Sequence, residues 1–194
     1  MKAKLFNNYH VAPVSKEAYD SFRAVNEPKI FTNRFDLDAA GALNELEKDA
    51  VARLSKNLGT PYELRLGLFC GEDLVGWSYG YQISQDTFRM VTSGLLDSHQ
   101  RKGVYSAFLS SLEQHLKEQG FQVIFSRHYA TDNQVIIPKL RFGFLITGME
   151  LTDEFGLLLR LSYFFNETRR KALHMRSGFQ QADESVKKLV RRYD

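Results

Sequence analysis

The sequence contains a single cysteine, Cys70, among its 194 residues. One cysteine excludes an intramolecular disulfide and argues against a structural zinc site, which draws on several cysteine or histidine ligands. No long stretch is free of charged residues, so we expect no helix that crosses a membrane. Cys70 is expected to pack as a small apolar side chain near the end of a strand.

Several short motifs are also missing. The first residues, Met1 to Asn8, have no apolar core of the kind that a signal peptide carries, which leads us to expect a cytoplasmic protein. Neither Gly-x-x-x-x-Gly-Lys-Ser/Thr nor Gly-x-Gly-x-x-Gly occurs. Because these glycine-rich loops hold the phosphates in the common nucleotide sites, their absence argues against a nucleotide-binding protein of either class.

The composition is that of a soluble globular protein, with 43% hydrophobic and 25% charged residues. The length suits one domain with a sizeable core, so we predict a single domain over 1–194. We expect it to consist of a helical region over 1–60, a sheet-forming core over 62–165 and a basic helical tail over 166–194.

The net charge of +3 is unevenly distributed, because basic residues gather near the end of the chain. Two interpretations fit this tail: a solvated helix face, or a surface for nucleic acid or another acidic partner. We favour the solvated face, since Glu167, Asp183 and Glu184 interrupt the run. The basic residues are Arg169, Arg170, Lys171, Arg176, Lys187, Lys188, Arg191 and Arg192.

The first third of the chain predicts two helices. A short extended piece over 7–13 precedes a helix over 15–26, which Pro28 is expected to close. A second helix is expected to begin at Asp36 or Asp38. Its apolar residues recur at helical spacing and form a stripe of Leu43, Leu46, Ala50, Val51 and Leu54.

From Tyr62 onward, short β-forming runs joined by short turns predict an antiparallel meander. An apolar run that follows the next helix predicts a strand parallel to the last strand of the meander. We therefore predict an α/β (α+β) fold with a mixed, mostly antiparallel sheet of six to seven strands, one parallel pair and helices on both faces. Pro138 falls inside a later helix, which is expected to be one turn long or kinked. The expected strands are 63–70, 74–83, 87–96, 121–126, 144–151 and 157–165, and the later helices are 104–119, 131–142, 166–175 and 183–193.

A polar turn from Asp97 to Ser106 joins the third strand of the meander to the long helix. The first N–H groups of a helix have no intrahelical acceptor, and together with the helix dipole they favour an anion. Gly103 allows close approach of a ligand to the backbone, and Arg101 and Lys102 add positive charge. On this stretch alone, an anion site and an ordinary turn with solvated charges both stay open.

Two motifs in this order resemble the GNAT superfamily of acyl-CoA-dependent N-acetyltransferases. The run from Gln100 to Tyr105 matches the first two fixed positions of the family's Gln/Arg-x-x-Gly-x-Gly/Ala turn, while Tyr105 stands where Gly or Ala is usual. Asn133 and Gly143-Phe144 match a second landmark, an Asn after the parallel strand and a Gly-Phe after a short helix. The resemblance covers roughly 62–165.

This resemblance implies acetyl-CoA as the cosubstrate. Backbone N–H groups from Arg101 to Ser106 would hold the pyrophosphate, the end of the third strand would pair with the pantetheine amides, and Asn133 would contact the pantetheine arm. Tyr105 would narrow the turn, swing onto the ligand or pack at the helix start. The residues implied in cofactor binding are Leu95, Leu96, Gln100, Arg101, Lys102, Gly103, Val104, Tyr105, Ser106, Asn133 and Lys139.

In many relatives, a Tyr four residues before the Gly of Gly-Phe protonates the departing thiolate, and here that position is Lys139. Three roles stay open for Lys139: an acid if it is desolvated, a ligand of a CoA phosphate, or a solvated residue. The other catalytic candidates are His128, Tyr129 and Ser93. No metal is required, and positioning of the amine can supply much of the acceleration.

The resemblance thus implies an N-acetyltransferase that moves an acetyl or other acyl group from its CoA thioester to a primary amine. The alternative is a weakly active or inactive CoA-binding sensor or interaction module of the same fold, because Lys139 replaces the usual acid. The expected partners are acetyl-CoA and an amine acceptor, without membrane or nucleic acid, and a homodimer stays open. The N-terminal helices, their loop around 31–35 and the final hairpin are expected to form the acceptor pocket.

Overall fold

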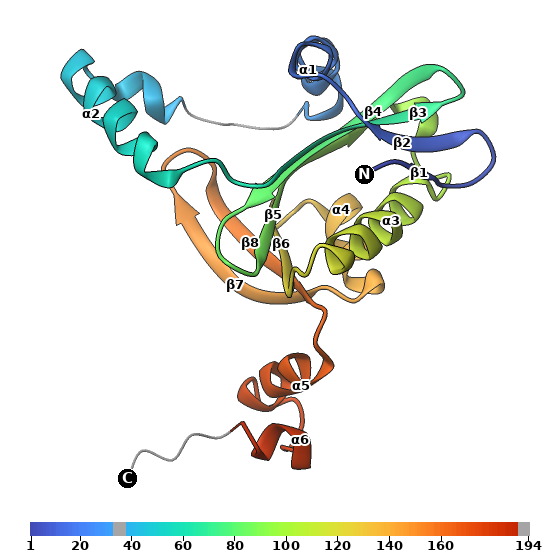
Figure 1. The fold of residues 1–194 in the computed structure, drawn as a ribbon, viewed down its shortest axis with the longest axis vertical. Coiled ribbons are helices and arrows are strands. Elements are labelled where there is room, and N and C mark those ends of the chain that lie inside the picture. The colour runs from blue at the N-terminus through green and yellow to red at the C-terminus, as the bar shows by residue number, and fades with distance from the viewer. Residues whose placement is uncertain (33–37, 190–194) are drawn as a thin grey trace.

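The computed structural model describes residues 1–32 and 38–189, which fold around one sheet with strand order β1-β2-β3-β4-β5-β6-β8-β7. Neighbouring strands are antiparallel except for the parallel pair β5 and β6. Figure 1 shows α1 on one face of the sheet and α3 and α4 on the other. The strands are β1 (Ala3–Lys4), β2 (Tyr9–Pro13), β3 (Glu63–Cys70), β4 (Asp73–Gln82), β5 (Thr87–Leu95), β6 (Val123–Tyr129), β7 (Leu145–Thr152) and β8 (Gly156–Phe164). The helices are α1 (Lys16–Ile30), η1 (Ala39–Ala42), α2 (Glu45–Ser55), η2 (Lys56–Leu58), η3 (Asp97–His99), α3 (Val104–Glu118), α4 (Asn133–Phe142), α5 (Glu167–Arg176) and α6 (Glu184–Lys187).

The mixed, mostly antiparallel sheet with one parallel pair is the fold that the sequence predicts, and it is confirmed. The sheet has eight strands rather than six to seven. The additional strand is β1, whose two residues at the sheet edge are too few to show an alternating pattern.

The main apolar core lies between the sheet and α3. Phe108, Leu112 and Leu116 are each at most 2% exposed. Because they recur every four residues, they lie on one stripe of the helix and face the sheet together. Leu66 from β3 and Phe88 from β5 belong to the same cluster, so α3 is held firmly above the middle of the sheet.

The opposite face of the sheet is covered by α1 through aromatic side chains. The rings of Phe22 and Phe31 lie 6.1 and 6.2 Å from the indole ring of Trp77, measured between centroids. Tyr19 of the same helix contacts Tyr79 of β4 at 6.1 Å. These contacts hold α1 against the sheet.

The helix α1 continues to Ile30, so the prediction that Pro28 closes it is wrong. A proline removes one backbone hydrogen bond, and here the lost bond lies near the end of the helix. The N–H of Phe31 still donates to Glu27 at 2.9 Å, and its ring packs on Trp77. Tertiary packing therefore outweighs the local preference of proline.

The helix α2 stands away from the sheet, at the upper left of Figure 1. Asp38 caps η1 rather than a long helix, and Asn44 opens α2 with a capping box. Asp36, the other predicted start, lies outside the described residues. The predicted apolar stripe is not packed on the core, since Leu46 is 81% and Leu54 is 65% exposed.

The helix α4 runs over ten residues with Pro138 inside it, so of the two expected alternatives, a single turn or a kinked helix, the single turn is wrong. Gly143 ends the helix in the left-handed conformation, with a φ of 116°. Its N–H and that of Phe144 both donate to the carbonyl of Lys139. These two bonds close the last turn of the helix.

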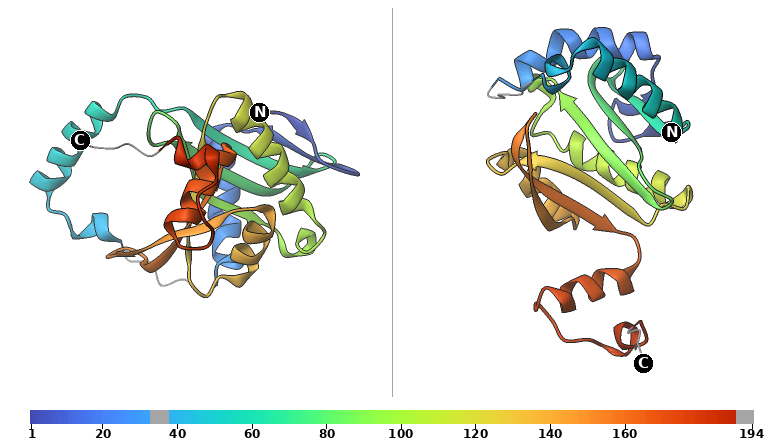
Figure 2. Two further views of the ribbon diagram at one scale, coloured as in Figure 1. Left: turned by 90° about the horizontal axis from the view of Figure 1, so that it is seen from below. Right: turned by 90° about the vertical axis from the view of Figure 1, so that its left-hand side faces the viewer.

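The helices α5 and α6 extend away from the sheet beyond β8 (Figure 2). Their basic side chains lie at the surface, where Lys171 pairs with Asp183 at 2.8 Å and Arg169 pairs with Asp86 at 2.9 Å. The last predicted helix, 183–193, is observed as the short α6, and 190–194 lie outside the described residues. No helix in the described ranges is long and apolar enough to cross a membrane.

The contact between Gly94 of β5 and Trp77 of β4 gives a test of this packing. A Cβ added to Gly94 would lie 2.3 Å from Cη2 of the indole ring, which is buried beneath α1. We predict that Gly94→Ala lowers the free energy of unfolding by about 1–3 kcal/mol, the usual cost of overpacking. Gly148→Ala in β7 is the matched control, because a Cβ there meets nothing within 4 Å. Equilibrium denaturation measures both, and equal stability of the two variants would contradict the predicted clash.

Candidate functional site

The parallel strands β5 and β6 separate partway along their length. Pairing runs from Thr87 opposite Val123 to Met90 opposite Ser126. Beyond that pair, β5 continues beside β4 alone and β6 continues beside β8 alone. We call the region beyond Met90 and Ser126, between the facing edges of β5 and β6, the split. Among the described residues, no neighbouring strand bonds the main-chain groups along its two edges.

A β-bulge in β5 begins where the strands part. Tyr79 of β4 lies opposite Thr92, whereas Gly80 lies opposite Met90, so Val91 is an extra residue in β5. A bulge bends its strand and increases the local twist. The extra residue therefore gives a physical reason why β5 turns away from β6 directly after Met90.

Alternate residues of β5 direct their backbone into the split. The N–H of Leu96 donates to the carbonyl of Val75 at 2.9 Å. By alternation, the N–H and C=O groups of Leu95 and Ser93 point away from β4 and toward β6. The side chain of Gln100 donates to the Leu95 carbonyl at 2.8 Å and leaves the Leu95 N–H directed into the split. An extended ligand can therefore pair with β5 as an added strand.

The expectation that Leu96 pairs with the ligand through its backbone needs a correction. Its N–H is bonded to Val75, and its carbonyl accepts a hydrogen bond from the N–H of His99 at 2.8 Å. Both groups are used within the protein, so the main-chain groups of this strand that face the split are those of Ser93 and Leu95.

The turn after β5 gathers backbone N–H groups at the start of α3. Arg101 and Gly103 have positive φ angles of 57° and 83°, a conformation in which successive N–H groups converge. Within 1–32 and 38–189, none of the backbone N–H groups from Arg101 to Ser106 donates to a protein acceptor. A Cβ on Gly103 would meet nothing within 4 Å, so the space above it is open. The turn has the geometry of an anion site.

The side chains of this turn divide into packed and exposed ones. Val104 is 1% exposed in the core. Tyr105 packs against the core with its ring 6.3 Å from that of Phe108, and burial together with Asp132 raises the pKa of its hydroxyl. Of the three placements predicted for Tyr105, the structure shows packing at the helix start. The exposed side chains are those of Arg101, Lys102 and Ser106.

Lys139 reaches from α4 to the point where the strands separate. Its Nζ donates to Ser126 Oγ at 2.6 Å and lies 3.7 Å from Met90 Sδ. These are the last two residues that pair before the split. The side chain is 1% exposed, and its Nζ lies 5.1 Å from the centre of the Phe144 ring. Of the three predicted roles, the solvated one is therefore wrong.

Burial lowers the pKa of Lys139 to about 7, while the negative charge of Asp132 acts in the opposite direction. No salt bridge joins Lys139 to a carboxylate in the part of the chain that the structure describes. An amine with a pKa near neutrality gains and loses its proton readily, so Lys139 is suited to acid-base chemistry.

Ser126 joins Lys139 to another predicted residue. Its Oγ lies 2.8 Å from Nε2 of His128, and Ser126 itself is 2% exposed. The sequence-based candidates do not include Ser126. In the sequence, Ser126 differs from its neighbours only as a polar residue at the end of the mostly apolar run from Phe121 to Ser126.

The other two catalytic candidates are Ser93 on β5 and Tyr129 on β6. The hydroxyl of Ser93 is hydrogen-bonded to that of Ser78 on β4 at 2.9 Å. Tyr129 ends β6, and strand alternation turns it to the face opposite Ser126 and His128. The structure thus joins Lys139 and His128 through Ser126 and joins Ser93 to Ser78.

Asn133 is the exposed first residue of α4. The preceding residue, Asp132, affects the pKa of both Tyr105 and Lys139, so the start of α4 lies close to the start of α3.

The predicted acceptor pocket is only partly described. Phe31 packs on Trp77 beneath α1, while 33–35 lie outside the described residues. On the other side of the split, β8 pairs with β6 along the whole length of β6 and places the final hairpin beside it.

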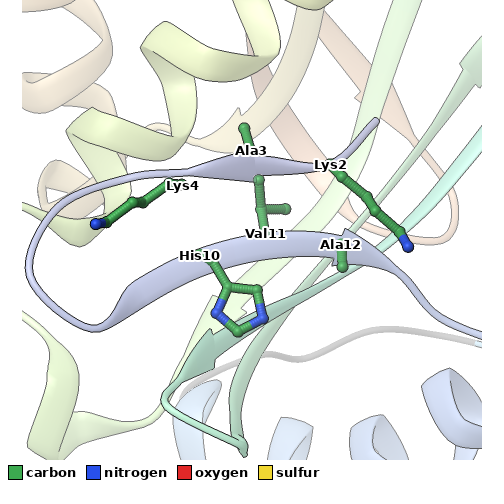
Figure 3. A pocket seen from close by; sticks show the side chains of 6 residues that line it. All are labelled: Lys2, Ala3, Lys4, His10, Val11 and Ala12. Atoms are coloured by element: carbon green, nitrogen blue, oxygen red, sulfur yellow. The ribbon is translucent and has the colours of Figure 1, made fainter.

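A surface hollow lies at the far edge of the sheet, on β1 and β2 (Figure 3). Strands β3 and β4 separate it from β5, so it takes no part in the site at the split. Its lining consists of Lys2, Ala3, Lys4, His10, Val11 and Ala12.

No protein-family model and no curated protein matches the sequence. Solved structures match over most of the chain. The ribosomal-protein-S5-alanine acetyltransferase from Vibrio fischeri has a TM-score of 0.60 at 13% identity, covering 86% of this chain and 98% of that one. RimL, a ribosomal L7/L12 alpha-N-protein acetyltransferase in complex with coenzyme A, has a TM-score of 0.61 at 13% identity, and the match covers 84% of this chain and 98% of that one. A GNAT family acetyltransferase from Elizabethkingia anophelis with acetyl-CoA bound has a TM-score of 0.57 at 10% identity, and the match covers 82% of this chain and 100% of that one.

The chain has the GNAT fold. The GNAT fold expected from the two sequence motifs is thus confirmed by structures that share at most 13% of their residues with this chain. Two of these GNAT-fold structures contain CoA or acetyl-CoA.

The depressed pKa of Lys139 predicts how stability depends on pH. In the folded protein the pKa is about 7, against 10.5 for an ordinary lysine. Between these values the unfolded chain holds a proton that the folded chain has released, so stability rises with pH. We predict that wild type gains up to about 1.4 kcal/mol per pH unit relative to Lys139→Met, which cannot bind this proton.

Equilibrium denaturation between about pH 7 and 9 measures this difference. Lys117→Met is the matched control, because Lys117 is exposed on α3 and its loss should leave the pH dependence unchanged. Parallel curves for wild type and Lys139→Met would show that the pKa of Lys139 is not depressed.

Proposed function

We propose that this protein is an N-acetyltransferase that transfers an acetyl group from acetyl-CoA to a primary amine. The observation that carries the proposal is the continuity between the split and the turn at 101–106. Main-chain groups suited to an extended arm lead along β5 to a cluster of N–H groups suited to a pyrophosphate. CoA combines an amide-containing arm and a pyrophosphate in this order. The CoA-bound structures of the same fold support this choice of ligand.

In this proposal the pyrophosphate lies on the backbone N–H groups from Arg101 to Ser106, and the side chains of Arg101 and Lys102 add positive charge. The pantetheine arm pairs with the exposed backbone groups of Ser93 and Leu95, and Asn133 contacts it from the start of α4. The thioester then lies toward the apex of the split.

The proposed reaction is direct attack of the amine on the thioester carbon. A C–N bond forms, the C–S bond breaks, one proton leaves the nitrogen and one proton reaches the sulfur. The N–H of Leu95 points into the split and is suited to donate to the oxyanion. His128 and Lys139 are the candidates for proton transfer, and Ser93 and Tyr129 flank the split as further ones.

The competing function is a CoA-binding sensor or interaction module with little or no turnover. The observation that favours it is Lys139, which stands where a tyrosine acid is usual in the family that the sequence resembles. The two functions share the CoA site and differ only in chemistry, so an activity assay separates them.

We predict that Gly103→Val abolishes CoA binding. Gly103 has a φ of 83°, which a β-branched residue adopts only with strain, and a side chain there would stand among the N–H groups of the turn. Gly120→Val is the matched control at the other end of α3, since Gly120 has a φ of 91° and equally open surroundings. Calorimetric titration with CoA measures both variants. Unchanged affinity of Gly103→Val, or equal losses in both, would refute the assignment of the turn.

Release of free thiol from acetyl-CoA in the presence of amines tests the activity. We predict amine-dependent thiol release with at least one member of a panel that contains an alanine-ended peptide, a serine-ended peptide, spermidine and glucosamine. The peptides are included because two of the matching structures are, by their names, acetyltransferases of ribosomal proteins. Tight CoA binding without amine-dependent release on any member would favour the binding module.

A further inference from the structure

Three side chains form a hydrogen-bonded chain at the apex of the split. We propose that Lys139, Ser126 and His128 are a proton relay that carries the proton of the attacking amine to the departing thiolate. This inference rests on the proposed function and adds to it the groups that move the proton. It assigns a role to Ser126, which neither the sequence pattern nor the matching folds identify.

The location of the relay follows from the strand register. The last paired residues of β5 and β6 are Met90 and Ser126, and the ammonium nitrogen of Lys139 contacts both side chains. Lys139 therefore lies where the two strands begin to separate. The turn at 101–106 lies at the opposite end of the exposed stretch of β5. When the pyrophosphate occupies that turn, the acyl group at the other end of the CoA arm reaches the apex of the split.

The direction of the relay follows from strand geometry. Ser126 and His128 are two residues apart on β6, so both side chains lie on the face toward α4. Ser126 is buried at the apex, whereas His128 lies beyond it, is partly exposed and flanks the split. The hydrogen-bonded relay thus runs from the buried Nζ of Lys139 through the Ser126 hydroxyl to the His128 imidazole, which is nearer to solvent.

The chemistry of the three groups suits transfer in both directions. A serine hydroxyl donates one hydrogen bond and accepts others, so it can accept a proton from one neighbour while it donates to the other. Lys139 gains and loses its proton near neutral pH, and an imidazole does so too in its ordinary range. Met90 and Phe144, which do not titrate, also lie near the Lys139 ammonium, and Asp132 acts on it as a charge.

The proposed step is balanced in atoms and charge. The neutral amine attacks the thioester carbon, and His128 takes the proton that the new C–N bond makes acidic. As the C–S bond breaks, the Lys139 ammonium gives a proton to the sulfur. Ser126 then passes the proton of the His128 imidazolium to the Lys139 amine, which restores all three groups and leaves amide and CoA thiol as products.

The test measures thiol release at saturating acetyl-CoA with the most reactive amine of the panel, as a function of pH. Lys139→Met should lower kcat about 100- to 10,000-fold, the range typical of a lost acid-base group. The affinity for CoA should stay within about threefold, because binding rests on the turn and on β5. Lys117→Met is the control for a lysine-to-methionine change at an exposed site and should keep wild-type kcat.

Ser126 is a positioning and relay residue, so its test needs more than a loss of rate. The hydroxyl accepts a hydrogen bond from the ammonium, and its removal lowers the pKa of Lys139 further. In Ser126→Ala, kcat should therefore fall at all pH values, and its decline toward alkaline pH should begin at a lower pH. Ser126→Thr keeps a hydroxyl and should restore the wild-type pH profile. His128→Gln keeps a hydrogen-bonding side chain but cannot carry the proton, and it should lose the acid limb of the profile.

Three outcomes overturn the relay. Wild-type kcat in Lys139→Met would remove its proton donor. An evenly lowered kcat in Ser126→Ala, with the alkaline limb unmoved and without recovery in Ser126→Thr, would reduce Ser126 to a packing role. CoA binding without turnover by wild type would overturn the proposed function together with the relay, whereas failure of the relay alone leaves wild-type turnover intact.

Discussion

The early end of parallel pairing between β5 and β6 is the constraint on which the site depends. The two strands share four residue pairs, and the bulge at Val91 then bends β5 away. A sheet interrupted in its middle leaves backbone groups that no strand satisfies, and such groups are costly unless water or a ligand bonds them. Gln100 satisfies the carbonyl of Leu95, while the adjacent N–H stays directed into the split. In the proposed function, a ligand that pairs with β5 would complete the sheet at this point.

The burial of Lys139 is the second physical fact that the fold must accommodate. A buried ammonium loses hydration that one hydroxyl and one aromatic ring replace only in part. Burial outweighs the attraction of Asp132, so the side chain releases its proton near neutral pH. Methionine of similar length would fill the same space at no such cost. A buried lysine at the apex of the split is therefore better explained by its chemistry than by packing.

The sequence predicted the sheet, its one parallel pair and the turn after β5, because alternation, turn residues and the helix start at Gly103 are local patterns. The predictions were wrong where contacts between distant residues determine the structure. Pro28 is held inside α1 by the packing of Phe31 on Trp77. The apolar stripe of α2 is largely exposed among the described residues. The resemblance placed Lys139 at a catalytic position, yet its burial became visible only with the fold. Ser126 stayed hidden because a single serine in a strand has no distinctive pattern, and its role depends on Lys139, thirteen residues away along the chain.

A lysine at this position responds to the reaction differently from a tyrosine. A tyrosine acid is neutral before it donates, so the developing thiolate gains a hydrogen bond but no opposite charge. The Lys139 ammonium is positive, and a thiolate forming near it in a poorly solvated place raises the pKa of the amine through their attraction. In the proposed reaction, the charge on Lys139 would therefore be stabilised most while the C–S bond breaks. Such an interaction is stronger in the transition state than in the ground state, which is the condition for accelerating the chemical step. Within the proposed function, the low pKa of Lys139 is therefore its value before the reaction, and it rises when the thiolate forms nearby.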